Sequence, residues 1–224
     1  MTYTFDFGAI FSHWEEIVSG ILLTLKLSSE TLLLGLVVGI AGAWARTSSS
    51  MLLNRIVLAY VEVIRNTPFL VQLLLIYLGL PYLGIRLTPI GAALLAMTIN
   101  FGAYAIEIVR AGIESIPRGQ IDAGRALGLT GPQIFGLIVL KPAVSAIFPA
   151  LCGQFILIML GSSVVSAISA EELTAVANNL QAITFRPFEI FIVVGAIYVM
   201  LTLGFEALFH VVERRLFKFR FVRT

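Results

Sequence analysis

Only 12% of the 224 residues are charged and 58% are hydrophobic, which excludes a water-soluble globular domain, because such domains carry about 25% charged residues. The mean hydropathy is +0.97, and the apolar residues fall in runs close to the roughly 20 residues that a helix needs to cross a bilayer. The net charge of +2 is too small to indicate nucleic acid binding. We therefore expect an all-α membrane protein that forms one transmembrane domain over residues 1–224.

Five membrane spans are predicted, and two of them start at a threonine-proline pair. Proline needs no backbone N–H at the first helical position, and a threonine hydroxyl can bind the free N–H groups of the first turn. Thr67-Pro68 and Thr88-Pro89 therefore predict the starts of the second and third spans. The spans are expected over residues 18–45, 68–83, 89–109, 134–160 and 187–211, with a helix over 51–65 that helps to complete the second.

Polar connections are predicted at residues 110–133 and 161–186, and the charges set the orientation. With the amino terminus outside, eleven basic residues lie on the cytoplasmic side and only Arg86 and Arg186 lie outside, as the positive-inside rule requires. We therefore predict an outside amino terminus and a cytoplasmic carboxyl terminus. The eleven are Arg46, Arg55, Arg65, Arg110, Arg118, Arg125, Arg214, Arg215, Lys218, Arg220 and Arg223.

The sequence lacks the motifs of most membrane enzymes and motors. There is no G-x-x-x-x-G-K-[ST] phosphate loop and no H-E-x-x-H, and Cys152 is the single cysteine. No catalytic residue, metal site or cofactor is therefore expected in this chain. The energy for any transport must come from a partner subunit or an ion gradient.

The connection 110–133 contains a short predicted helix over residues 120–127. Asp122 lies near its positive amino end and Arg125 toward its negative carboxyl end, while Gly128 can adopt the left-handed conformation that ends a helix. Its apolar side needs a surface to cover it, and two remain open: the chain and bilayer to which it belongs, or a docking partner. The apolar residues are Ile121, Ala123 and Leu127.

Three ordered motifs resemble those of bacterial ABC-importer permeases. The segment from Asp122 to Leu140 resembles the E-A-A-x3-G-x9-I-x-L-P motif, with Asp122 at the glutamate position and Gly128 at the glycine position. Residues 65–73 (RNTPFLVQL) and 102–120 (GAYAIEIVRAGIESIPRGQ) look like stretches of the polar amino acid subfamily, which includes histidine, glutamine and arginine permeases. The resemblance covers nearly the whole chain.

The resemblance implies the five-helix core of a type I importer, a place in the bacterial inner membrane and ATP-driven import of polar amino acids. It also implies a second permease chain, two subunits that bind ATP and Mg²⁺, and an external substrate-binding protein. An ion-gradient-driven amino acid carrier, with Glu30 or Glu107 loading ions, is the alternative. The ATPase-coupling residues carried over are Gln120, Ile121, Asp122, Ala123, Gly124, Arg125, Leu127 and Gly128.

Polar residues within the spans are candidates for the substrate pathway, since such groups are costly in a bilayer unless they have a function or a partner. Glu107 and Arg110 are three residues apart, which fits a structural ion pair as well as substrate contact. The isolated amides can equally form hydrogen bonds between helices, and the two serines can cap a loop. The candidates are Gln72, Asn100, Tyr104, Glu107, Gln154, Ser162 and Ser163.

The chain departs from this resemblance in its fourth span. Many relatives have a polar run resembling N-E-F-I-N-L-L-K there, and Leu157 and Leu160 stand at its asparagine and lysine positions. The motif's proline position holds Lys141, and Pro142 follows, so the start of this span is expected to kink differently. Either this chain binds substrate differently, or a second permease chain supplies the contact; we predict a second, non-identical permease chain that provides at least some charged substrate contacts.

Overall fold

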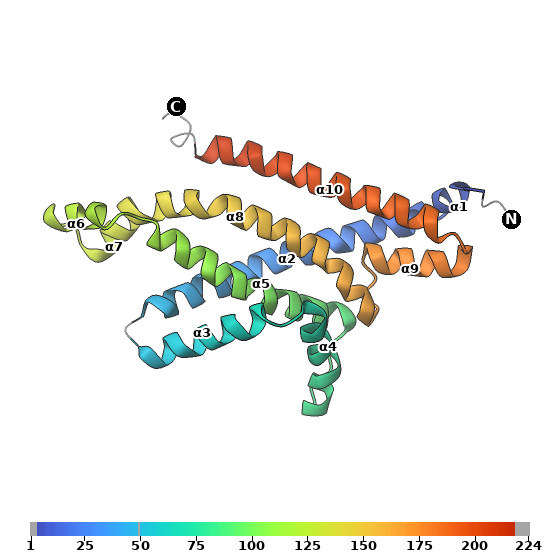
Figure 1. Ribbon diagram of the computed structural model, residues 1–224, viewed down its shortest axis with the longest axis horizontal. Coiled ribbons are helices and arrows are strands. Elements are labelled where there is room, and N and C mark those ends of the chain that lie inside the picture. The colour runs from blue at the N-terminus through green and yellow to red at the C-terminus, as the bar shows by residue number, and fades with distance from the viewer. Residues whose placement is uncertain (1–3, 49, 218–224) are drawn as a thin grey trace.

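The computed structural model describes residues 4–48 and 50–217, where all regular structure is helical. Long helices run along one axis, with the amino terminus at one end and the carboxyl terminus at the other (Figure 1). The elements are α1 (Gly8–Phe11), α2 (Trp14–Thr47), α3 (Met51–Arg65), α4 (Phe69–Gly79), η1 (Leu80–Leu83), α5 (Pro89–Glu114), α6 (Arg118–Ala126), α7 (Gly131–Ile134), η2 (Phe135–Val139), α8 (Leu140–Gly161), η3 (Ser162–Ile168), α9 (Leu173–Thr184) and α10 (Pro187–Leu216).

Four helical runs are each long and apolar enough to cross a membrane: α2, α5, the continuous run Gly131–Ile168 and α10. The pair formed by α3 with α4 and η1 passes the same test together, although its two parts are bent by 106°. Counted as one broken span, the pair brings the total to five. The predicted all-helical membrane protein with about five spans is therefore confirmed.

The contact between α2 and α5 lies at the centre of the bundle. Gly35 and Gly39 of α2 are four residues apart and meet Phe101 and Ala105 of α5. A Cβ atom on Gly39 would lie only 2.6 Å from the Cβ of Ala105, so a larger residue there would push the helices apart. Small residues at such spacing let membrane helices approach closely, which replaces the hydrophobic driving force that lipid does not provide.

The chain turns sharply between α3 and α4. The sequence predicted that Thr67 caps the following helix, but its hydroxyl donates backward to the Val63 carbonyl, 2.8 Å away, at the end of α3. Pro68 has no N–H and disfavours helical backbone in the residue before it, so α3 cannot continue through this point. As a result α4 leaves the bundle sideways (Figure 1).

The start of α5 follows the predicted pattern. The Thr88 hydroxyl accepts a hydrogen bond from the Gly91 N–H at 3.1 Å, and Pro89 occupies the first turn. The fourth span begins less regularly, because the π-helical turn η2 precedes Pro142. A proline clashes with the carbonyl four residues earlier, and a wider turn relieves that clash.

Residues 161–186 are not the polar connection that the sequence predicted. They form η3 and α9, and α9 buries Leu173 and Leu180 in a cluster with Ile17 of α2 and Ile190 of α10. This helix lies beside the start of α10, at the end of the bundle that carries the amino terminus (Figure 1). The apolar residues of α9 do follow a helical spacing, but polar residues between them hide the pattern.

Glu172 caps α9 and is completely buried. Its Oε1 accepts a hydrogen bond from the Ala175 N–H at 2.9 Å, and its Oε2 accepts one from the Tyr198 hydroxyl at 2.8 Å. Burial raises the pKa of the Glu172 carboxyl, because the loss of solvent disfavours the charged form more than these hydrogen bonds favour it. The outer corner of the fold therefore contains a carboxyl group that is easier to keep neutral than an ordinary one.

A raised pKa in the folded state makes the contribution of Glu172 pH-dependent. Its stabilisation is complete below the ordinary carboxyl pKa of about 4.3 and is lost as the pH rises through the raised folded value. We expect the Tm of the purified wild-type protein to fall from pH 5 to pH 8, and the Glu172→Gln variant to lose much of this fall. The exposed neighbour variant Glu171→Gln is the control, and identical pH profiles for Glu172→Gln and wild type would contradict the assignment.

The basic residues gather at the end opposite the amino terminus, where the carboxyl ends of α2 and α10 lie with α6 (Figure 1). The structure separates Arg65 from this group, because α3 carries it about 15 Å beyond Arg55 along the helix axis. Lys218, Arg220 and Arg223 lie outside the described residues. The remaining residues still favour a cytoplasmic location for the α6 end.

We expect single cysteines at positions 118 and 186 to react oppositely with a membrane-impermeant reagent in intact cells. Arg118→Cys in a Cys152→Ala background should be protected, because α6 lies at the positively charged end, whereas Arg186→Cys should be labelled. Permeabilised cells, in which both sites should react, provide the control. Labelling of position 118 from outside would reverse the orientation.

Candidate functional site

A groove runs along α5 and α8 on the side where α3 turns into α4. Its inner part, toward α6, has a volume of about 480 Å³, and its outer part has a volume of about 230 Å³. Tyr104 and Gln154 line both parts, which joins them. The inner lining carries charges from Arg65, Glu107 and Arg110, and the outer lining is largely apolar and includes Phe69, Asn100, Leu157 and Ile158.

Glu107 is the centre of an ion network in the inner part. Its Oε2 lies 2.7 Å from the nearest Arg110 nitrogen, and its Oε1 lies 4.0 Å from an Arg46 nitrogen. Arg110 also binds the carboxylate of Glu114. The ion pair between Glu107 and Arg110, one of the two interpretations of their spacing, is therefore confirmed, and Arg110 has two carboxylate partners.

Arg65 lines the groove and does not lie at the cytoplasmic surface, where the charge pattern of the sequence predicted it. Its guanidinium carbon lies 5.3 Å from the centroid of the Tyr104 ring, within the range of a cation–π interaction. Within residues 4–48 and 50–217, no carboxylate forms an ion pair with Arg65. The sequence does contain a signal for this position: ten residues of one predicted helix separate Arg65 from Arg55, a length of about 15 Å.

The Gln72 side chain ties the corner between α3 and α4 together and is buried behind the groove. Its Nε2 donates to the Ile64 carbonyl and to the Thr67 hydroxyl, each at 2.8 Å, and its Oε1 accepts from Asn100 Nδ2 at 3.0 Å. Helix–helix hydrogen bonding, the alternative role for this amide, is confirmed. Asn100 therefore reaches both the corner and the outer part of the groove.

The two serines close the end of α8. The buried Ser162 hydroxyl donates to the Met159 carbonyl at 2.7 Å, and the Ser163 hydroxyl donates to the Leu160 carbonyl at 2.8 Å. Neither residue belongs to the described lining of the groove. Of the seven candidate residues, the groove thus brings together four, namely Asn100, Tyr104, Glu107 and Gln154.

The short helix α6 ends as the sequence predicted, at Gly128 in the left-handed conformation with a φ of 76°. The Gly128 N–H donates to the Arg125 carbonyl at 3.0 Å, and the Leu129 N–H donates to the Gly124 carbonyl at 3.1 Å. These are the two hydrogen bonds of a Schellman motif. A residue with a side chain would have space at Gly128 but would meet the steric penalty of the left-handed region, about 1 kcal/mol or more.

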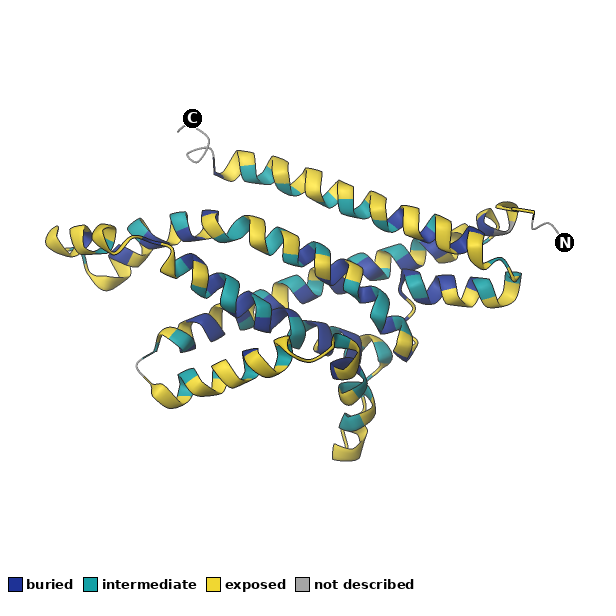
Figure 2. Cartoon of the chain, in the orientation of Figure 1, coloured by how far each residue is buried: buried dark blue, intermediate teal, exposed yellow. Residues whose placement is uncertain are grey.

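One face of α6 rests on its own bundle and the other is uncovered, as Figure 2 shows. Gly124 is buried so closely that a Cβ there would lie 2.6 Å from Ile138 Cδ1, and Ile121 packs on the same apolar cluster. Ala123 is exposed and Leu127 is 79% exposed. The bundle therefore covers only part of the apolar side of α6, and the rest remains available to the bilayer or to a docking partner.

Comparison with known proteins shows that the sequence is similar to transport proteins along most of its length. Residues 33–218, which include the groove and α6, match the family described as binding-protein-dependent transport system inner membrane component. The glutamine transport system permease protein GlnP of Escherichia coli is 35% identical, over 95% of this chain and 98% of that relative. The L-cystine transport system permease protein TcyB of Bacillus subtilis is 34% identical, over 92% of this chain and 88% of that relative.

Solved structures agree with these relatives. A chain from a crystal structure of an amino acid ABC transporter with histidines is 38% identical. The match covers 95% of this chain and 100% of that chain, with a TM-score of 0.90. A chain of the MetNI methionine ABC transporter, in an inward-facing conformation, is 21% identical and has a TM-score of 0.77 over 92% of this chain and 98% of its own. The second likeness concerns the fold alone.

Proposed function

This chain belongs to the family of binding-protein-dependent transport system inner membrane components, and from that membership we infer that it is the permease subunit of an ABC importer for polar amino acids. It is a multi-pass protein of the bacterial inner membrane and works with ATPase subunits and a binding protein. ATP is handled by the ATPase partners, so this chain is no enzyme. The main support for the mechanism is α6, a short helix at the end of the bundle that has one uncovered face.

We propose that the groove is this chain's part of the substrate pathway within the single transmembrane domain formed by residues 1–224. Asn100, Tyr104, Glu107 and Gln154 line it, and Gln72, Ser162 and Ser163 support its walls. The groove is open on one side, which fits a pathway completed by a second permease chain. Glu107 is one of the two residues, with Glu30, that could load ions in a gradient-driven carrier, and this role of Glu107 is disfavoured because two arginines already surround its carboxylate.

We further propose that α6 is the handle through which two ATPase subunits, one for each permease chain, move the transmembrane helices. Gly124 holds the helix against Ile134 of α7 and Ile138 of η2, so a force on α6 reaches these two turns by direct contact and α8 through them. Leu127 offers an apolar side chain to a cleft in the partner. The Gly128 turn then brings the chain directly from the exposed helix back into the fourth span.

Replacing Gly128 by arginine should disrupt this geometry while leaving the spans inserted, since the added side chain strains a left-handed residue but has open space. We expect near-normal membrane levels, loss of uptake, and ATP hydrolysis that is either abolished or no longer stimulated by substrate. Uptake by membrane vesicles and hydrolysis by the purified complex provide the measurements.

Gly131→Arg is the matched control, because Gly131 also has no atom within 4 Å of a built Cβ but does not have a left-handed backbone. This variant should retain uptake. Full uptake with normally stimulated hydrolysis in Gly128→Arg would contradict the coupling role of α6.

We propose that the second permease chain is not identical to this one. Leu157 is 62% exposed and Leu160 is 38% exposed on α8, and Leu157 lines the outer part of the groove. The fourth-span motif that this chain resembles has asparagine and lysine at these positions, so α8 of this chain lacks contacts that a different chain can supply. The support is therefore the apolar Leu157 in an outer lining whose polar side chains, Asn100, Tyr104 and Gln154, carry no charge.

Native mass spectrometry of the transporter purified from its own membranes should detect two different permease masses. A mixed complex is expected because an uncharged wall on both sides would leave the charged groups of an amino acid without oppositely charged partners in the outer part. A complex that contains two copies of this chain, has no second permease and transports normally would contradict the heterodimer.

A further inference from the structure

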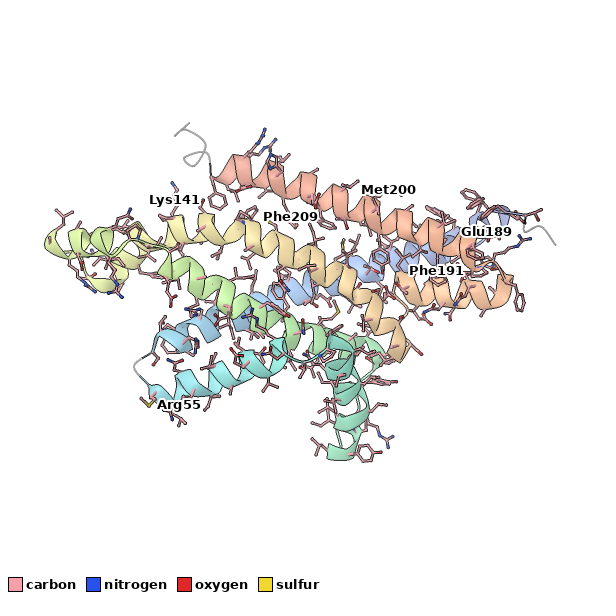
Figure 3. All side chains as sticks on the ribbon, viewed as in Figure 1. Arg55, Lys141, Glu189, Phe191, Met200 and Phe209 are labelled. Carbon is pink, nitrogen blue, oxygen red and sulfur yellow. The ribbon has the colours of Figure 1, made fainter. Side chains whose placement is uncertain are left out.

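Arg65 stands at the end of α3, well away from the end of the bundle where the other basic residues gather. Arg55 lies near the start of α3, at the labelled end of that helix in Figure 3, and Arg65 follows about 15 Å along the axis. The hydrocarbon core is roughly 30 Å thick, so Arg65 lies near its centre when Arg55 is at the inner interface. A charged side chain at this depth requires a partner or a water-filled space, because lipid solvates it poorly.

The structure gives Arg65 the space, and among the residues it describes no carboxylate forms an ion pair with it, although Glu107 lines the same part of the groove and is close enough to interact with it electrostatically. The side chain is exposed and lines the inner part of the groove. The other two arginines nearby differ from it: Arg110 binds Glu107 and Glu114, while Arg46 approaches Glu107 and donates to Asn54 Oδ1 at 2.8 Å. Arg65 is thus the lining cation available to an anion that enters the groove.

Tyr104 prepares this cation for a planar anion. The guanidinium carbon lies over the Tyr104 ring, 5.3 Å from its centroid, which leaves the N–H groups that point away from the ring free to bind an anion. Those N–H groups match the two oxygens of a carboxylate in a bidentate pair. Tyr104 lines both the inner and the outer part, so the pair lies where the two parts meet.

We propose that Arg65 binds the carboxylate group of the transported amino acid and that Tyr104 positions its guanidinium. The proposal rests on the proposed role of the groove as the substrate pathway. It assigns to α3 a charge that Leu157 and Leu160 do not provide from α8. Substrate recognition in this half of the transporter then depends on the corner between α3 and α4, which Gln72 and Asn100 hold in place.

Direct binding to the purified complex of permease and ATPase chains, without the binding protein, tests this assignment. The probes are the amino acid that the wild-type complex accumulates best among glutamine, histidine, arginine and cystine, and the α-carboxamide of that amino acid. Wild type should bind the carboxylate form at least about tenfold more tightly, since a charge-assisted pair is lost with the carboxamide. Arg65→Gln should bind both forms equally weakly, and Arg65→Lys should keep part of the preference.

Arg55→Gln is the matched control, because it removes the same charge from the same helix near the end opposite to Arg65 (Figure 3), and Arg55 does not line the groove. It should leave the preference for the carboxylate unchanged. If Arg65→Gln does not assemble, the comparison of Tyr104→Leu with Tyr104→Phe decides, because only the first removes the ring face and should lower the preference several-fold.

Retention of the full carboxylate preference by Arg65→Gln, or by Tyr104→Leu in the second comparison, would overturn the proposal. So would a wild-type complex that transports the amino acid but binds both forms equally, and that result would leave the proposed function intact. Failure of the wild-type complex to accumulate any of the four amino acids with ATP and its binding protein would overturn the proposed function as well.

Discussion

The close approach of α2 to α5 is the constraint on which the rest of the arrangement depends. Gly35 and Gly39 remove the side chains that would separate the two helices, and Phe101 and Ala105 occupy the space. With α5 fixed on this side, its other surface faces α3, α4 and α8, and it carries Asn100, Tyr104 and Glu107 into the groove. The pathway residues are therefore positioned by a contact that none of them makes.

A second constraint acts at the corner between α3 and α4. Pro68 stops α3, Thr67 satisfies a carbonyl at its end, and Gln72 binds back to Ile64 while reaching Asn100. These hydrogen bonds provide partners for backbone carbonyls that the bend would otherwise leave without one in a lipid environment. They also determine where α3 ends, and hence the depth at which Arg65 meets Tyr104.

The sequence predicts those features that depend on neighbouring residues. The start of α5 at Thr88 and the end of α6 at Gly128 agree because a cap or a left-handed glycine acts within one turn. Thr67 differs, because its hydroxyl can bind either the last carbonyls of α3 or the first N–H groups of α4. The bend between the two helices determines that it binds a carbonyl of α3.

Tertiary packing explains the remaining differences. The burial of Glu172 and α9 depends on α2 and α10, which lie far away in the sequence. The sequence predicts the groove only as a set of polar residues. Hydrogen bonds to the α3 end hold Gln72 outside the groove lining, and the angle between α3 and α5 brings Arg65 over Tyr104 in the lining. Both depend on how the helices pack.

The bend between α3 and α4 also has a consequence for biogenesis. Neither helix is well suited to enter the membrane alone, because α3 has 15 residues with two charges near its end and α4 has only 11. Each charge costs about 2.5–3.5 kcal/mol at the centre of a helix leaving the translocon. Partners on α5 lower the cost of the charged and polar groups in both helices: the Arg65 guanidinium lies over the Tyr104 ring, Ile99 accepts a hydrogen bond from the Tyr60 hydroxyl at 2.6 Å, and Asn100 donates one to Gln72. Stable insertion of the second span is thus expected to wait until the ribosome has delivered the third.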